Sequence, residues 1–74
     1  MTITDLMKVA RQYGWRAVAG GGGVDFTKGD HYLDVSVDSS GDLVEAWTAT
    51  PPHNQGPIPG ATYESCAEFL KEHA

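Results

Sequence analysis

The stretch VDFTKGDHYLDVSVDSSGDLVEAWT, residues 24–48, alternates apolar side chains with polar or acidic ones. A period of two is typical of β-strands that bury one face and expose the other. Turn-forming residues interrupt the alternation at 28–31 and 38–42. The stretch therefore predicts strands at 24–27, 32–37 and 43–48, whose exposed face is acidic.

Another short strand is expected at residues 15–19, before the run of four glycines. Because the connections are short, the strands should pair in sequence order as an antiparallel meander. The strand at 43–48 is harder to orient. We favour Val44 and Ala46 facing the core, whereas a β-bulge would place Leu43 and Ala46 on that side.

Residues 3–13 and 62–72 carry apolar side chains at helical spacing, which predicts a helix at each end. Thr2 or Thr4 can cap the first helix, and Thr62 the second. The first helix is expected to end at a left-handed Gly14, after which Trp15 can fold back against its last turn.

All four prolines lie within residues 51–60. Because proline donates no backbone hydrogen bond, we expect the sheet to end there in an extended crossover loop. The predicted fold is a single α+β domain over residues 1–74: an antiparallel three- to four-stranded meander flanked by an N-terminal and a C-terminal helix, both on one sheet face. The predicted core is Leu6, Met7, Ala10, Val24, Phe26, Leu33, Val35, Val37, Cys66, Ala67 and Leu70.

The chain has 74 residues and a net charge of −5, from ten acidic and five basic side chains. Such a protein attracts neither nucleic-acid phosphates nor anionic lipids, so we expect no nucleic acid and no membrane among its partners. Cys66 is the single cysteine and excludes an internal disulfide. Together with the lack of a signal-peptide pattern, this predicts a cytoplasmic protein.

No motif for catalysis or metal binding is complete. The glycine run leads into a strand rather than a helix, which favours a hairpin loop over a nucleotide site. Cys66 and the histidines at 31, 53 and 73 lack metal-ligand spacing, and the turn at 38–42 has its glycine too early for a calcium loop. We therefore expect no metal, no cofactor and no enzymatic activity.

The outward positions of the predicted sheet form the candidate site. Neighbouring strands lie about 4.8 Å apart, so the outward carboxylates should cluster, with two aromatic side chains among them. Aromatic side chains are enriched in protein interfaces. The candidate partner-binding residues are Asp25, Tyr32, Asp34, Ser36, Glu45 and Trp47.

The first helix, the glycine-rich break, the Asp-Phe-x-x-Gly-Asp turn at 25–30 and the Ser-Gly-Asp turn at 40–42 together resemble small uncharacterised proteins encoded by phages of actinobacteria. That resemblance implies an accessory protein that binds a host or phage protein in the bacterial cytoplasm. The order helix, strands, helix also resembles the double-stranded RNA-binding domain. That family has basic residues where this chain has Thr62-Tyr63-Glu64-Ser65, so RNA binding is not expected.

Three hypotheses follow. The first is a non-enzymatic interaction module that presents its acidic sheet face to a partner with a basic surface. The second is a homodimer of structural or regulatory role, because a short chain has a small core and Trp15 is expected near an unpaired strand edge. The third is a small enzyme, which would need Cys66, His31 or His53 to converge in a pocket.

Overall fold

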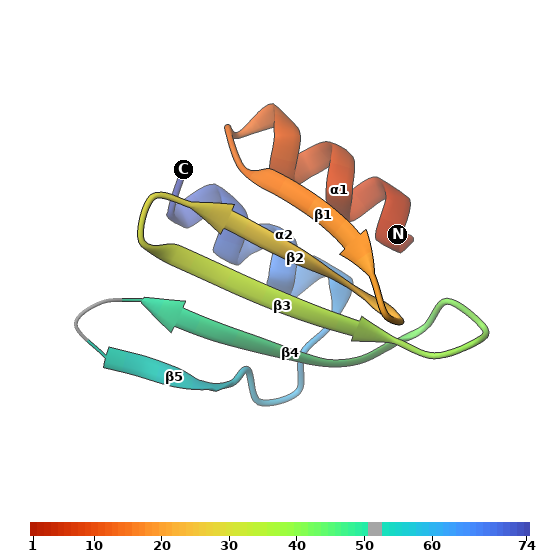
Figure 1. The fold of residues 1–74 in the computed structure, drawn as a ribbon. Coiled ribbons are helices and arrows are strands. Elements are labelled where there is room, and N and C mark those ends of the chain that lie inside the picture. Colours follow the sequence, from red (N-terminus) through yellow and green to blue (C-terminus); the bar gives the residue numbers. More distant parts are fainter. Residues whose placement is uncertain (51–52) are drawn as a thin grey trace.

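The computed structural model describes residues 1–50 and 53–74, as two helices and a five-stranded antiparallel sheet (Figure 1). The elements are α1 (Ile3–Gln12), β1 (Arg16–Gly20), β2 (Gly23–Lys28), β3 (His31–Val37), β4 (Leu43–Thr50), β5 (His53–Pro57) and α2 (Tyr63–Glu72). The strands lie side by side in sequence order, each antiparallel to the next. The predicted α+β fold is confirmed, with one strand more than expected.

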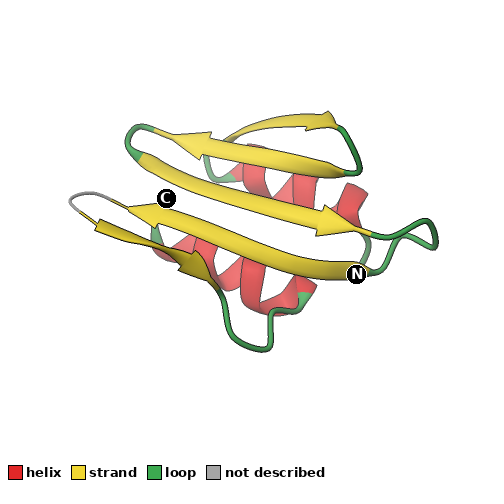
Figure 2. Cartoon of the chain, turned by 60° about the horizontal axis from the view of Figure 1, so that its bottom comes forward, coloured by secondary structure: helices red, strands yellow, loops and turns green. Residues whose placement is uncertain are grey.

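Both helices cover the same face of the sheet, as predicted, and leave the opposite face uncovered (Figure 2). The helices and the inner face of the sheet enclose one core, made of Leu6, Ala10, Trp15, Val24, Phe26, Leu33, Val35, Ala46, Cys66, Ala67 and Leu70. Met7 and Val37, which were predicted to be in the core, are only partly buried against it. Among the described residues, no helix has the length and apolar character needed to cross a membrane.

The end of α1 places Trp15 in the core. Gly14 adopts a left-handed conformation with φ of 85°, and the Trp15 amide donates a hydrogen bond of 2.8 Å to the Ala10 carbonyl. This conformation and this bond form a Schellman motif, and they confirm the left-handed Gly14 and the fold-back of Trp15 expected from the sequence. The Trp15 side chain is 3% exposed, and its indole Nε1 donates to the Leu70 carbonyl at 2.9 Å. One residue therefore connects the end of α1 to the last turn of α2.

Both helices also begin as predicted. The Asp5 amide donates to the Thr2 hydroxyl at 3.2 Å, and the Ser65 amide donates to the Thr62 hydroxyl at 3.0 Å. In each case the cap residue's own amide donates to the side chain of the third helical residue, Asp5 or Ser65, which completes a capping box. Tyr63 then donates from its hydroxyl to the Gly41 carbonyl at 2.6 Å, so α2 is attached to the β3–β4 loop at its start.

The glycine run forms the loop of the β1–β2 hairpin. Gly20 pairs with Gly23, and Gly21 and Gly22 between them have φ angles of 56° and 82°. Two consecutive positive φ angles define the type I′ turn, which glycine adopts without strain. The hairpin interpretation is confirmed, and the run leads into a strand rather than a helix.

The favoured orientation of β4 is confirmed for Ala46 but wrong for Val44, and the alternative with a β-bulge is the one observed. The pairing shifts between Ser36 and Val37, so that Val37 faces Leu43 while Ser36 still faces Glu45. Val44 is the extra residue of this β-bulge and is 62% exposed. The bulge allows both Leu43 and Ala46 to pack on the inner face, which the unbulged register with Val44 inward cannot do.

The crossover loop expected at 51–60 is also wrong in part, since β5 extends the sheet within it. As an edge strand, β5 needs hydrogen bonds on one side only, so a proline at its end is tolerated. Pro57 lies opposite Trp47, and the Ile58 amide donates to the Ala46 carbonyl at 2.8 Å. The expectation for residues 51–52 lies outside the described residues.

Candidate binding surface

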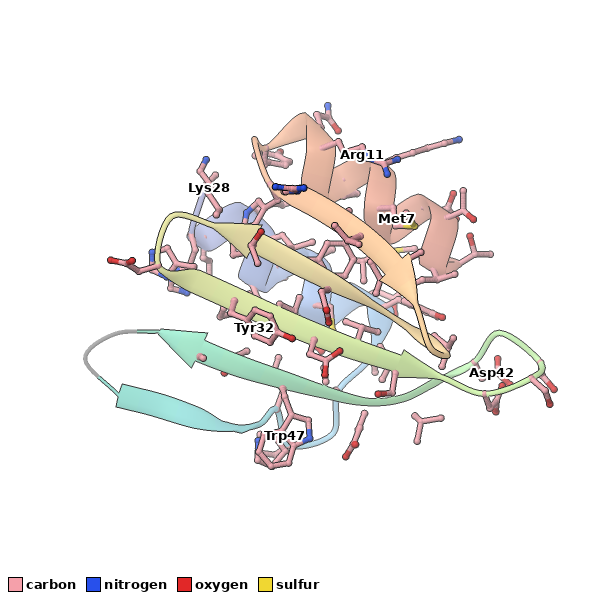
Figure 3. The ribbon with its side chains drawn as sticks, viewed as in Figure 1. Met7, Arg11, Lys28, Tyr32, Asp42 and Trp47 are labelled. Carbon is pink, nitrogen blue, oxygen red and sulfur yellow. The ribbon has the colours of Figure 1, made fainter. Side chains whose placement is uncertain are left out.

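The sheet face opposite the helices carries all six predicted site residues, and we call it the outer face. Asp25, Asp34 and Trp47 lie directly opposite one another across β2, β3 and β4. Ser36 lies opposite Glu45 in a neighbouring row. Tyr32 precedes Asp34 by two residues and so points to the same side. Figure 3 shows Tyr32 and Trp47 on adjoining strands of this face.

Carboxylates on the outer face are close enough to influence one another. Cβ atoms of directly opposite residues are about 5 Å apart, which applies to Asp25 and Asp34. Partial burial raises the pKa of Asp34, and so do its hydrogen bonding with Asp25 and the negative charges of Asp25 and Glu45. The ionised form of Asp34 is therefore destabilised in the free protein. A cation placed here would offset that repulsion.

Tyr32 is held over this cluster as a neutral donor. Its hydroxyl donates to Asp25 Oδ1 at 3.0 Å. Partial burial, this hydrogen bond and the nearby charges of Asp34 and Asp25 raise the pKa of the phenol. Tyr32 therefore lies beside the carboxylates with its proton retained at neutral pH.

A hollow of about 210 Å³ opens in the outer face between β3 and β4. It is lined by Tyr32, Asp34, Trp47, Thr48 and Ala49. Trp47 remains 43% exposed, so much of its ring surface is available to a partner. Aromatic rings beside a carboxylate are well suited to a positively charged group, which gains both cation–π and ionic attraction.

Two residues of β1 also lie on the outer face and were not predicted as site residues. In the β1–β2 register, Val18 lies opposite Asp25 and Arg16 lies opposite Thr27, so both share the face of the acidic cluster. Val18 is 51% exposed. The two-residue turn at Gly21 and Gly22 fixes this register. The glycine run was therefore the sequence signal from which the orientation of Arg16 and Val18 could have been predicted. Arg16 is the one basic side chain that the strands, as far as they are described, place on the outer face.

The residues considered for catalysis have other surroundings. Cys66 is fully buried in the core, and burial raises the pKa of its thiol to about 11. The His31 ring lies 4.8 Å from that of His73 and 6.3 Å from that of Trp15, and its Nδ1 is buried without a hydrogen-bond partner. The side chain of His53 lies outside the described part. Within the part that is described, no three His, Cys, Asp or Glu side chains form a group able to hold a metal.

Comparison with known proteins assigns no role to the outer face. No family model matches the chain, and no match is found among curated proteins or solved structures. The chemistry of the outer face is therefore the basis on which its role can be inferred.

Proposed function

We propose that this protein is a non-enzymatic interaction module whose outer face binds a protein partner with a basic surface. The observation that carries the proposal is the row Asp25–Asp34–Trp47 beside the hollow. It combines clustered negative charge with an exposed aromatic ring, on the side of the sheet that the helices leave uncovered. An accessory role in a bacterial host, which the resemblance to phage proteins implies, is part of this proposal.

The negative charge of the outer face favours a partner with a basic surface. Asp25, Asp34 and Glu45 gather on one face, and the pKa of Asp34 is raised by its partial burial and, in addition, by the negative charges of the other two. Lysine or arginine side chains from a partner would convert this repulsion into attraction. Complementary charges of this kind also accelerate association, so binding should weaken as the salt concentration rises.

The hollow gives the proposal a more specific form. A lysine or arginine side chain that enters it would lie against the rings of Tyr32 and Trp47 and approach the carboxylate of Asp34. Exposed cation–π contacts contribute about 0.5–1 kcal/mol, and more when water is excluded. The partner's anchor is thus one basic side chain, and the remaining acidic residues orient it.

The test compares the wild-type protein with the double variant Asp34→Lys, Glu45→Lys in affinity capture from lysate of the source cells. A partner bound by the wild type should be lost by this variant. The matched control is Glu68→Lys, Glu72→Lys, which makes the same change in net charge on exposed positions of α2. The control should retain the partner.

Three further results decide the matter. All variants must first show the circular dichroism and cooperative unfolding of the wild type. Trp47→Ala should then weaken binding of the captured partner by about 1–2 kcal/mol, as expected of an aromatic anchor. A partner that binds the acidic-face variant and the wild type equally well would rule out the outer face as the binding surface.

A further inference from the structure

Strand β1 has an open edge. In the described structure β1 pairs with β2 on one side, and it is the first strand of the sheet. The two-residue turn makes Gly20 and Gly23 a hydrogen-bonded pair, and such pairs alternate along an antiparallel ladder. Arg16 and Val18 therefore bond to β2, whereas Ala17 and Ala19 direct their N–H and C=O groups outward. Four backbone groups on this edge are left for another strand.

The sequence of β1 does little to protect that edge. Natural edge strands often carry lysine, proline or an inward charge that discourages pairing with another chain. Residues 16–20 read Arg-Ala-Val-Ala-Gly, with no proline and one charge at the start. Val18, in the middle, exposes 51% of its surface.

We propose that β1 pairs with β1 of a second copy of this chain, antiparallel and about a two-fold axis at Val18. This register sets Ala17 opposite Ala19 of the second copy, and Ala19 opposite Ala17. Both are hydrogen-bonded pairs, so all four outward groups on each strand gain partners. A two-fold contact of this kind is self-complementary, as closed dimers require.

The side chains fit the same register. Val18 meets Val18 of the second copy as a non-hydrogen-bonded pair, the closer type of pair, with Cα atoms about 4.5 Å apart. Arg16 lies opposite Gly20 of the second copy, whose neighbour on β2 is Gly23. Neither glycine has a side chain to block the guanidinium. Arg16 can therefore extend across them toward Asp25 of the second copy, two residues along β2, where opposite charges attract.

The assembled sheet would be continuous through both copies. Because the two-fold axis is perpendicular to the sheet, the helices of both copies lie on one side and both outer faces on the other. The dimer leaves the hollow of each copy open, so this inference stands independently of the proposed binding function.

The first test is the solution mass of the full chain, measured by sedimentation equilibrium over a range of concentrations. The interface is small, so the wild type should move from the monomer mass of 7.9 kDa toward twice that value in the range of about 10 µM to 1 mM. Val18→Lys brings two ammonium groups together at the axis and should raise the dimer Kd by at least about tenfold. Val44→Lys is the matched control, because Val44 is equally apolar and 62% exposed but lies on β4. Val44→Lys should show the same dependence of mass on concentration as the wild type.

Amide hydrogen exchange tests the register directly. The Ala17 and Ala19 amides should become protected as the concentration rises, while the Val18 amide is protected throughout. Ala19→Pro removes an outward N–H that β2 does not use, so it should abolish dimerisation while the monomer remains folded. A wild type that stays monomeric to about 1 mM, or a dimer that persists in Val18→Lys, would overturn the proposal. Protection that does not change with concentration would do the same.

Discussion

Replacement of Asp34 by asparagine is expected to stabilise the fold at neutral pH. Asp34 lies directly opposite Asp25, with Glu45 as a diagonal neighbour. Asparagine keeps the shape of the side chain, removes its charge and is less costly to desolvate. The change therefore removes a repulsion without opening a cavity.

The magnitude follows from these positions. Two like charges about 5 Å apart repel by about 0.8 kcal/mol in a dielectric close to that of water. Glu45, at about 7–8 Å, adds about 0.5 kcal/mol, and physiological salt screens out roughly half of the total. The expected gain in the free energy of unfolding is about 0.5–1 kcal/mol. In a domain of this size that corresponds to a rise in Tm of about 2–8 °C.

Urea and thermal unfolding of Asp34→Asn, Asp25→Asn and the double variant provide the assay. Asparagine at position 25 keeps an oxygen that can accept the hydrogen bond from the Tyr32 hydroxyl. The double-mutant cycle therefore isolates the repulsion between the charges at positions 25 and 34. At about 1 M salt the Debye length falls to about 3 Å and most of the gain should disappear. A gain that is absent at low salt, or that persists at about 1 M salt, would refute the electrostatic explanation.

The pH dependence has a definite sign. Because the pKa of Asp34 is raised on folding, its contribution to stability is fully present below the pKa of an unfolded aspartate and is lost as pH rises through the folded pKa. The advantage of Asp34→Asn is therefore largest near neutral pH and shrinks as the pH falls toward about 4. Asp5, whose pKa the Thr2 amide lowers, contributes stability that is lost at low pH. That effect is common to both proteins and cancels in the comparison.

Three further predictions concern the core and the hairpin. Trp15→Phe should lower the free energy of unfolding by about 1–3 kcal/mol in urea titrations, because it leaves the buried Leu70 carbonyl without its donor. Cys66 should react with thiol reagents only as fast as the protein opens, since it is fully buried and its pKa is about 11, whereas urea-unfolded protein should react at once. Gly23→Ala should lower the Tm because its Cβ would overlap a β3 carbonyl oxygen, whereas Gly20→Ala meets no atom within 4 Å and should leave the Tm unchanged or higher.

Much of the fold follows from local patterns. The alternation at 24–27 and 32–37 predicted β2 and β3, because each strand has one face against the core and one away from it. The register of β4 could not be predicted in the same way, since the bulge depends on the packing of Leu43 against Val37, a partner from another strand. Strand β5 was missed because proline statistics apply to strands with neighbours on both sides, and β5 has one.

The candidate surface could likewise be predicted where it depends on local alternation, but not where it depends on strand pairing. Alternation alone placed the six predicted residues on one face, and the observed register brings them together. Arg16 and Val18 were not included because the sequence of β1 has no polar alternation from which to infer an orientation. The hollow was also beyond reach, because Thr48 and Ala49 line it only once the pairing of β3 with β4 is known.

The bond between Trp15 and the Leu70 carbonyl spans 55 positions of the chain, which has a consequence for protein synthesis. As the polypeptide leaves the ribosome, the hairpins of the meander can pair one after another, with only α1 available to shield their apolar side. Helix α2 supplies the rest of the cover, and it follows all five strands along the chain. Until it emerges, side chains such as Phe26 and Leu33 remain accessible to chaperones and proteases. A transcript truncated before α2 should therefore yield a product that is degraded rather than accumulated.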